Sequence, residues 1–169
     1  MGISQIVSYS NLFSQSYINL FNLINNRSNI PDPLGYKDRD FVYKKEPDVR
    51  DRDFKDYPFI ILKLSKNSPE NLSLSNTKGD MLILFECEIR SSNRMDGKHS
   101  GKGAEYLDAI SNNLFSTLLS ESNKRTLRGY TLYNLNLDTT DTDIVDVEGE
   151  QIYVRRFIIS FKTRMVLST

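Results

Sequence analysis

The N-terminal part of the chain has the hydrophobic periodicity of an amphipathic helix over residues 3–26. Apolar side chains such as Phe13, Leu20 and Ile24 recur there at steps of three and four residues, which place them on one helix face. No residue of this segment is charged, although the exposed face of a solvated helix normally carries Glu and Lys. The pattern predicts a helix whose polar face either packs on another subunit or reflects the chain's general richness in Asn and Ser.

Four later segments, at 57–64, 81–90, 130–137 and 151–167, have the apolar or alternating patterns typical of β-strands. The last is the longest, and Tyr153, Phe157, Ile159 and Phe161 share one of its faces. This segment contains neither Pro nor Gly, and both of its faces are half apolar. We therefore predict that it is a central strand of a sheet and that Phe157 belongs to the core.

A second helix is predicted over residues 104–120, where Leu107, Ile110, Leu114 and Leu118 form an apolar stripe. Residues 124–129 are expected to end it, because Gly129 favours a helix terminus. Helices and clustered strands in this order predict an α+β fold in one domain, residues 1–169. We expect a mainly antiparallel sheet of about four or more strands, with an N-terminal helix and a second helix packed on one face.

The segments between these elements are read as loops and hairpins. Residues 37–56 carry many charges of both signs and predict a charged hairpin or extended arm, with Phe41, Tyr43 and Phe54 as anchors, or alternatively a solvated loop. Residues 65–79 and 91–103 are rich in turn-forming residues and predict loops. The acidic stretch at 138–150 predicts a turn or hairpin.

Composition narrows the possible functions. Lys and Arg number 22 against 22 Asp and Glu, so the chain lacks the basic excess that is usual in a free-standing nucleic-acid binder. One Cys and one His exclude an intrachain disulfide or a Cys/His zinc site, and Cys87 is read as a small buried hydrophobe. No apolar run has the length of a membrane span, and the N-terminus lacks a signal-peptide pattern, so we expect a soluble intracellular product without a membrane partner.

Candidate catalytic motifs fail on their spacing. The glycine-rich loop at 97–103 has too few residues between its glycines for a phosphate-binding P-loop. Pro47-Asp48 and Asp96-Gly97-Lys98 are far apart for a magnesium-dependent nuclease, and no Lys follows Glu86 and Glu88 at the required step. The acidic stretch lacks the Gly of a calcium-binding EF-hand loop. The sequence therefore predicts no enzyme, no metal site and no cofactor.

Charged side chains gather in separate acidic and basic segments. The basic segments suggest contacts with a neighbouring subunit or with passing DNA, whereas the acidic stretch is either a solvated loop or a docking surface for a basic patch. Separated patches on a neutral chain suit head-to-tail self-assembly. The candidate subunit or pore contacts are Arg90, Arg94, Lys98, Lys102, Asp141, Asp143, Asp146, Glu148, Arg155 and Arg156.

The order of elements resembles one protein family. A helix leads to Tyr-Pro-Phe at 57–59, a strand ends in Ile89-Arg90, and a helix reads Ala-Glu-Tyr-Leu-Asp-Ala-Ile-Ser-Asn-Asn-Leu at 104–114. A strand before an acidic turn and a final strand with Tyr-Val-Arg-Arg-Phe-Ile-Ile-Ser-Phe at 153–161 follow. Over most of the chain this arrangement is similar to the tail terminator, or tail completion, proteins of long-tailed viruses. The likeness lies in the order of the predicted helices and strands and in the length of the chain, and no single motif is diagnostic.

The resemblance implies a structural virion protein without catalytic residues. Its subunits would form a homo-oligomeric ring, expected to be a hexamer, that caps the tail tube and joins it to the head–tail connector. The implied partners are the tail tube protein, a connector or stopper protein, and DNA that passes without base-specific contacts; the implied location is the virion. Another connector or tail component, such as a stopper or tube protein, and a nucleic-acid-binding protein or nuclease stay as alternatives.

Overall fold

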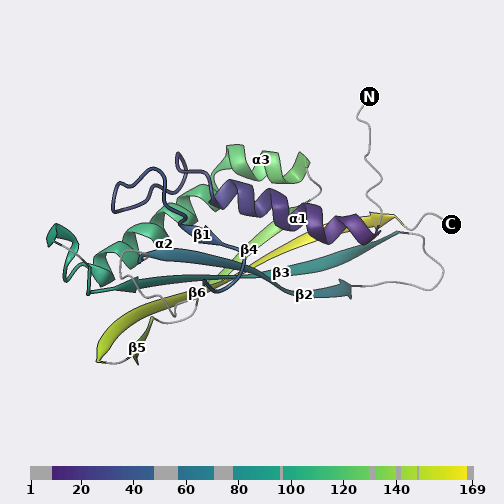
Figure 1. The fold of residues 1–169 in the computed structure, drawn as a ribbon. Helices are drawn as coiled ribbons and strands as arrows, with labels where there is room; N and C mark the ends of the chain where they lie inside the picture. Colours follow the sequence, from purple (N-terminus) through teal and green to yellow (C-terminus); the bar gives the residue numbers. More distant parts are fainter. Residues whose placement is uncertain are drawn as a thin grey trace.

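The computed structural model describes residues 9–47, 57–70, 78–95, 97–129, 132–139, 142–147 and 149–166. Its α+β architecture confirms the predicted fold class (Figure 1). The helices are α1 (Tyr9–Ile24), the short 3-10 helix η3 (Gly97–His99), α2 (Gly103–Leu119) and α3 (Glu121–Gly129). The strands are β1 (Val42–Tyr43), β2 (Phe59–Glu70), β3 (Lys78–Ser92), β4 (Tyr133–Thr139), β5 (Asp143–Val147) and β6 (Glu150–Val166).

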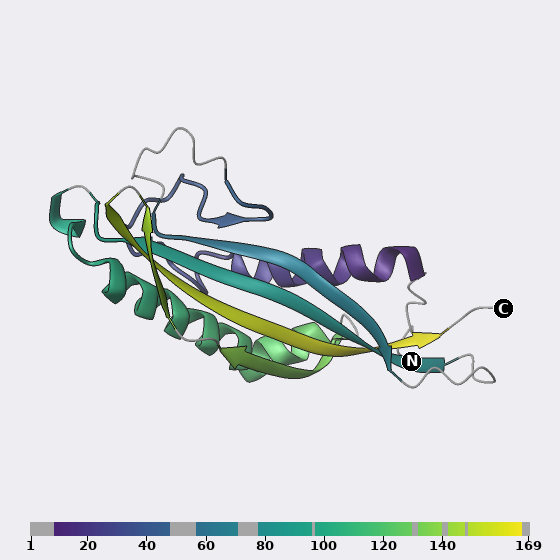
Figure 2. The same ribbon diagram turned by 90° about the horizontal axis from the view of Figure 1, so that it is seen from below.

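All six strands belong to one sheet with the order β1-β2-β3-β6-β4, and β5 also pairs with β6. Every pairing is antiparallel except that of β1 with β2. β6 has β3 on one side and β4 followed by β5 on the other, which confirms its predicted central position. Seen from below, β2 and β4 lie at opposite margins of the sheet, with β3 and β6 between them (Figure 2).

The main core lies between the sheet and the helices, which all cover the same face (Figure 1). The helices contribute Leu20 and Ile24 from α1 and Ile110 from α2, all completely buried. The sheet contributes Phe85 and Phe157, which are also completely buried, so the predicted core position of Phe157 is confirmed. Other members of this core are Ile60, Leu62, Ile83, Cys87, Ile89, Leu107, Leu114, Leu118, Ile159 and Phe161.

A smaller apolar cluster lies on the opposite face of the sheet. The cluster lies near the first residues of β2 and of β6. It contains Tyr57, Phe59, Ile61, Ile152 and Val154. Within the part of the chain that the structure describes, no helix covers this face (Figure 1). The alternation along β6 explains both clusters, because even-numbered residues up to Val154 face one way and Phe157, Ile159 and Phe161 face the other.

Both segments predicted as loops, 65–79 and 91–103, are partly strands. Ser91 and Ser92 of the second segment end β3. Residues 65–70 extend β2, and Lys78 and Gly79 begin β3, so the loop prediction for 65–79 is wrong at both ends; residues 71–77 lie outside the described part. Pairing continues from Lys66↔Leu84 to Glu70↔Asp80 after a register shift at Leu64. Asn, Ser and Pro in this stretch disfavour a strand locally, but pairing with the neighbouring strand overrides that preference.

The acidic stretch, predicted to be a turn or hairpin, is part of a hairpin in which residues 143–147 form β5 against β6. The consecutive β-branched residues Ile144 and Val145 favour a strand, and the neighbouring Asp143 and Asp146 carboxylates are exposed. The turn follows at Gly149, whose φ is 79° and whose N–H donates to Asp146 Oδ1 at 2.9 Å.

The second predicted helix is confirmed as α2, and a further helix, which the sequence did not predict, follows it. Ser120 has an extended backbone that ends α2, and its Oγ accepts the N–H of Asn123 at 3.1 Å. This is the hydrogen bond that caps a helix N-terminus, and Glu121 adds an acidic side chain to the first turn of α3. Residues 121–129 therefore form the separate helix α3 instead of only closing the second one.

The charged arm is described only as far as residue 47, and Phe54 lies outside the described part. Phe41 is buried, with the guanidinium carbons of Arg27 and Arg39 4.7 and 5.5 Å from its ring centre. Arg39 forms an ion pair with the buried Asp32. Tyr43 packs edge-on against Phe59 at 5.6 Å between ring centres, so Phe41 and Tyr43 are the expected anchors.

Candidate functional site

A charged cluster lies on the face of the sheet that the helices leave open. Glu88 on β3 is 4% exposed and accepts hydrogen bonds from Arg90 and, at 2.8 Å, from Nε of Arg156 on β6. Arg90 also reaches Glu46 at 2.6 Å, and Arg156 reaches Asp143 on β5 at 2.8 Å. We call these five residues the Glu88 cluster. It ties β3, β5, β6 and the segment after β1 together.

Two opposing effects act on the carboxyl group of Glu88. Burial raises its pKa, but the hydrogen bonds and charges of Arg90 and Arg156 outweigh burial, so the pKa lies below its usual value. Glu88 is therefore ionised at neutral pH, as a buried carboxylate between two guanidinium groups should be. A carboxylate that is ionised at neutral pH and paired with two guanidinium groups is suited to holding strands in register and not to transferring protons at that pH.

A cavity of about 320 Å³ adjoins the Glu88 cluster. Its apolar wall consists of Tyr57, Val145, Val147, Ile152 and Val154, and Glu46, Arg90 and Arg156 provide its charged wall. Within the described residues, no group of three or more His, Cys, Asp or Glu side chains is placed to hold a metal ion. The lining contains no Ser, Cys or His that could act as a nucleophile or base.

The structure brings together only some of the predicted contact residues. Arg90, Arg156 and Asp143 meet in the Glu88 cluster. Arg155 lies on the helix-covered face, where it contacts Asp108 and Ser111 of α2 at 2.8 and 3.0 Å. Arg90, Arg155 and Arg156 are thus paired within the chain, whereas the sequence predicted contacts with a neighbouring subunit or DNA for them. Asp141 and Glu148 lie outside the described residues.

The other predicted basic residues lie in the loop after β3, where Arg94, Lys98 and Lys102 are exposed. Asn93 holds this loop in place, with its Oδ1 accepting the N–H of Gly103 and its Nδ2 donating to the Tyr153 hydroxyl, both at 2.9 Å. A Cβ atom at Gly103 would lie 2.7 Å from the backbone of Ser92, so only Gly fits. Sequence reasoning missed Asn93, because a single Asn carries no signal of its partners.

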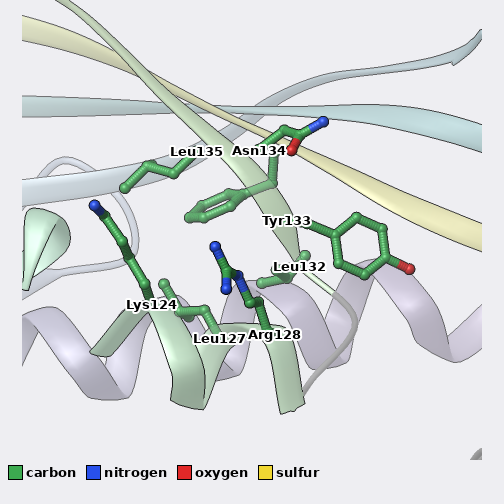
Figure 3. Close-up of a pocket in the computed structure, with 8 residues that line it drawn as sticks. Lys124, Leu127, Arg128, Leu132, Tyr133, Asn134 and Leu135 are labelled. Carbon is green, nitrogen blue, oxygen red and sulfur yellow. The ribbon is translucent and has the colours of Figure 1, made fainter. Parts of the chain in front are cut away.

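A second cavity, of about 180 Å³, lies between α3 and β4 (Figure 3). Lys124 and Arg128 rise from α3 toward β4, whereas the hydroxyl of Tyr133 points away from the cavity (Figure 3). Leu127, Leu132, Leu135 and Phe161 supply an apolar floor. Lys124 already pairs with Glu121 at 3.1 Å. This cavity offers positive charge over an apolar surface, and its lining has no carboxylate, thiol or imidazole.

The two margins of the sheet expose apolar side chains. On β5, Ile144 is 59% and Val145 is 42% exposed. At the β2 margin, Ile18 of α1 and Leu64 of β2 are exposed and line a groove of about 460 Å³ with Ser14, Tyr17 and Lys44. The apolar helix pattern predicted from the sequence does not include Ile18, and the turn or hairpin predicted for residues 138–150 does not specify β5 as a strand. The exposure of these apolar side chains at both margins depends on which strands lie at the edges of the sheet.

The described part of the chain contains no helix that combines the length and the apolar character needed to cross a bilayer. No protein-family model matches the chain, and no curated protein sequence matches it.

Proposed function

We propose that this chain is a structural virion protein, a tail terminator whose subunits form a ring that caps the tail tube and joins it to the head–tail connector. The observation that best supports this function is that the single sheet has two different margins, each with exposed apolar side chains. Unpaired sheet edges with exposed apolar side chains promote association between chains.

Contact between two different surfaces repeats from one subunit to the next. Such heterologous contacts close into a ring when the rotation between neighbours divides a full turn, and the proposed ring is a hexamer. The zero net charge of the chain favours this assembly, because identical subunits carry no overall repulsion.

The exposed loop with Arg94, Lys98 and Lys102 is suited to the pore of such a ring. Cations on a short loop neutralise phosphates without reading bases, so DNA could pass while making only sequence-independent contacts. The proposed protein partners are the tail tube protein and a connector or stopper protein, at the head–tail interface of the virion.

The test is removal of the gene from a virus that encodes this chain, followed by electron microscopy of the lysate. We expect filled heads and tail tubes that are not joined, and restoration of joined particles when the protein is supplied. The absence of any tube would indicate a tube protein instead, and heads that fail to retain DNA would indicate a stopper. Normal joined particles, or magnesium-dependent DNA cleavage by the purified protein, would contradict the proposal.

A further inference from the structure

We propose that the ring contact is formed by the β5 edge of one copy docking against the groove beside β2 of the next copy. This inference rests on the proposed ring and names the surfaces that build it. The occupant of the groove is a second copy of this chain. Three features support this contact. Both edges are unpaired, the groove and Ile144 lie on the same face of the sheet, and the edges carry opposite charges at Lys44 and Asp146.

The β2 margin is an open edge beyond the short strand β1. β1 pairs only with Ile60 and Ile61, and the N–H of Ile60 donates to the carbonyl of Phe41 at 2.8 Å. Alternate residues of a strand direct their backbone groups to the same side, so Leu62 faces this edge as well. Its carbonyl accepts the Tyr17 hydroxyl at 2.7 Å. Among the described residues, no strand pairs with this margin of β2 after Ile61.

The groove at this margin is apolar with one cation at its rim. Tyr17, Ile18 and Leu64 form its apolar surface, and Lys44 stands beside it with its Nζ 5.0 Å from the ring centre of Phe21. Burial raises the pKa of Tyr17 to about 12, so its hydroxyl stays neutral. Within the described residues, Lys44 forms no ion pair.

The β5 margin presents the complementary surface. β5 pairs with β6 only, so its other edge is unpaired within the described part of the chain. Ile144 lies opposite Tyr153 and Asp146 lies opposite Gln151, which places both on the helix-covered face of the sheet. The groove, lined by α1, is on that same face. When one sheet continues into the next, Ile144 enters the groove and Asp146 approaches Lys44.

The alternative of two β5 edges meeting each other is disfavoured by charge. Such an isologous contact would bring the Asp146 side chains of both copies toward each other on the helix-covered face, and like charges across paired strands are destabilising. Docking of β5 against the β2 groove instead joins an acidic edge to a basic rim. The contact is therefore heterologous, as a ring requires.

Disulfide trapping tests this contact directly, because the only native cysteine, Cys87, is buried. The variant carrying both Leu64→Cys and Ile144→Cys should give an intermolecular ladder on oxidation that ends at the ring size. Each single variant should stay monomeric, and an equimolar mixture of the two should give dimers only. The two positions lie three strands apart, about 14 Å across the sheet. They are also offset along the strands by the six residues between Ile159 and Tyr153, about 20 Å, which is too far for an internal disulfide.

The matched control is the variant with Tyr36→Cys and Leu119→Cys, two exposed apolar positions outside both margins, which should give no ladder. Because oxidation traps transient contacts, concentrated protein also reveals an interface that dissociates on dilution. Absence of the ladder from the Leu64→Cys, Ile144→Cys variant would overturn the inference. Dimers from Ile144→Cys alone would also overturn it.

A charge exchange provides a second measurement on the folded protein. Asp146→Lys and Lys44→Glu should each reduce trapping about tenfold, and the two together should restore it. A double variant as deficient as the singles would count against the pairing. Joined virions whose rings lack the Leu64–Ile144 contact would refute this interface and leave the proposed function standing, whereas joined virions after gene removal would refute the function itself.

Discussion

Glu88 on β3 lies directly opposite Arg156 on β6, and their carboxylate and guanidinium groups form a 2.8 Å ion pair across the open face of the sheet. Arg90 completes the cluster from the other side of the carboxylate. Because Glu88 is almost fully buried, its charge depends on these partners. The cluster thus fixes the register of the two longest strands and places β5, which Arg156 contacts through Asp143.

Replacing Glu88 should destabilise the fold. In Glu88→Gln two guanidinium groups lose their shared carboxylate, although each retains a more exposed one. We expect a loss of roughly 3 kcal/mol in the free energy of unfolding, the lower end for breaking a buried ion pair. Urea denaturation measures it, with Glu121→Gln, at an exposed surface pair, as the control that should change stability by less than about 0.5 kcal/mol. A loss below about 1 kcal/mol would show that Glu88 does not hold the strands.

The stability of the protein should also fall with acid in a way that depends on Glu88. Its pKa is lower in the folded state than in the unfolded state, where a Glu titrates near about 4.3. The ion pair therefore contributes its full stability above that pH and loses it as the pH falls through the folded pKa. Unfolding free energies of wild type and Glu88→Gln, measured between about pH 6 and pH 3, should converge as the pH falls. A difference between the two unfolding free energies that stays constant with pH would show that the ionisation of Glu88 does not cause the acid sensitivity.

Phe157 should be among the most costly positions to truncate. It is completely buried on the central strand and packs edge-on against Phe115 of α2, with ring centres 5.2 Å apart. Phe157→Ala should reduce the free energy of unfolding by roughly 3–5 kcal/mol, because a cavity remains. Ile144→Ala, at an exposed position, should change it by less than about 0.5 kcal/mol. If both substitutions lowered the free energy of unfolding by the same amount in denaturant melts, the core position of Phe157 would be contradicted.

Cys87 should not react with thiol reagents in the folded protein. Burial, with a smaller contribution from the charge of Glu88, raises the pKa of its thiol to about 12, and the side chain is inaccessible. A disulfide reagent at about pH 8 should label it only at the rate of unfolding, whereas Leu119→Cys adds an exposed thiol that should react at once. Rapid labelling of the wild-type protein would show that β3 opens locally.

Metal ions and nucleotides should leave the melting temperature unchanged, because a ligand stabilises only a folded state that binds it. The failed loop spacings of the sequence predict this result. Thermal melts with Mg²⁺, Zn²⁺ or ATP, compared with buffer alone, provide the measurement. A rise of several degrees with any of them would contradict it.

Much of the fold could be predicted because the hydrophobic pattern is strong where burial is complete. The alternation around Phe157 identifies a central strand, and the three- and four-residue steps through Ile110 identify α2. The pattern fails where local preference and tertiary pairing disagree, as at residues 65–70, whose polar composition hides a strand. Ser120 illustrates the opposite case, a capping residue whose signal was present and overlooked.

The candidate site was less predictable, because a charge in a sequence does not reveal its partner. The acidic and basic segments were expected to meet between subunits, yet Asp143 and Arg156 meet within one chain through the β5–β6 hairpin. The apolar margins followed only from the strand order, which places β5 at one limit of the sheet and, beyond the two-residue strand β1, β2 at the other. The exposed Ile144 and Leu64 then supplied the surfaces of the proposed contact.

The most direct test of the proposed function is to locate this chain in assembled particles. Antibody–gold labelling of virions, imaged by electron microscopy, should place the protein in a single ring at the joint between head and tail. Labelling along the whole tube, or absence of the chain from purified virions, would contradict the assignment as a tail terminator.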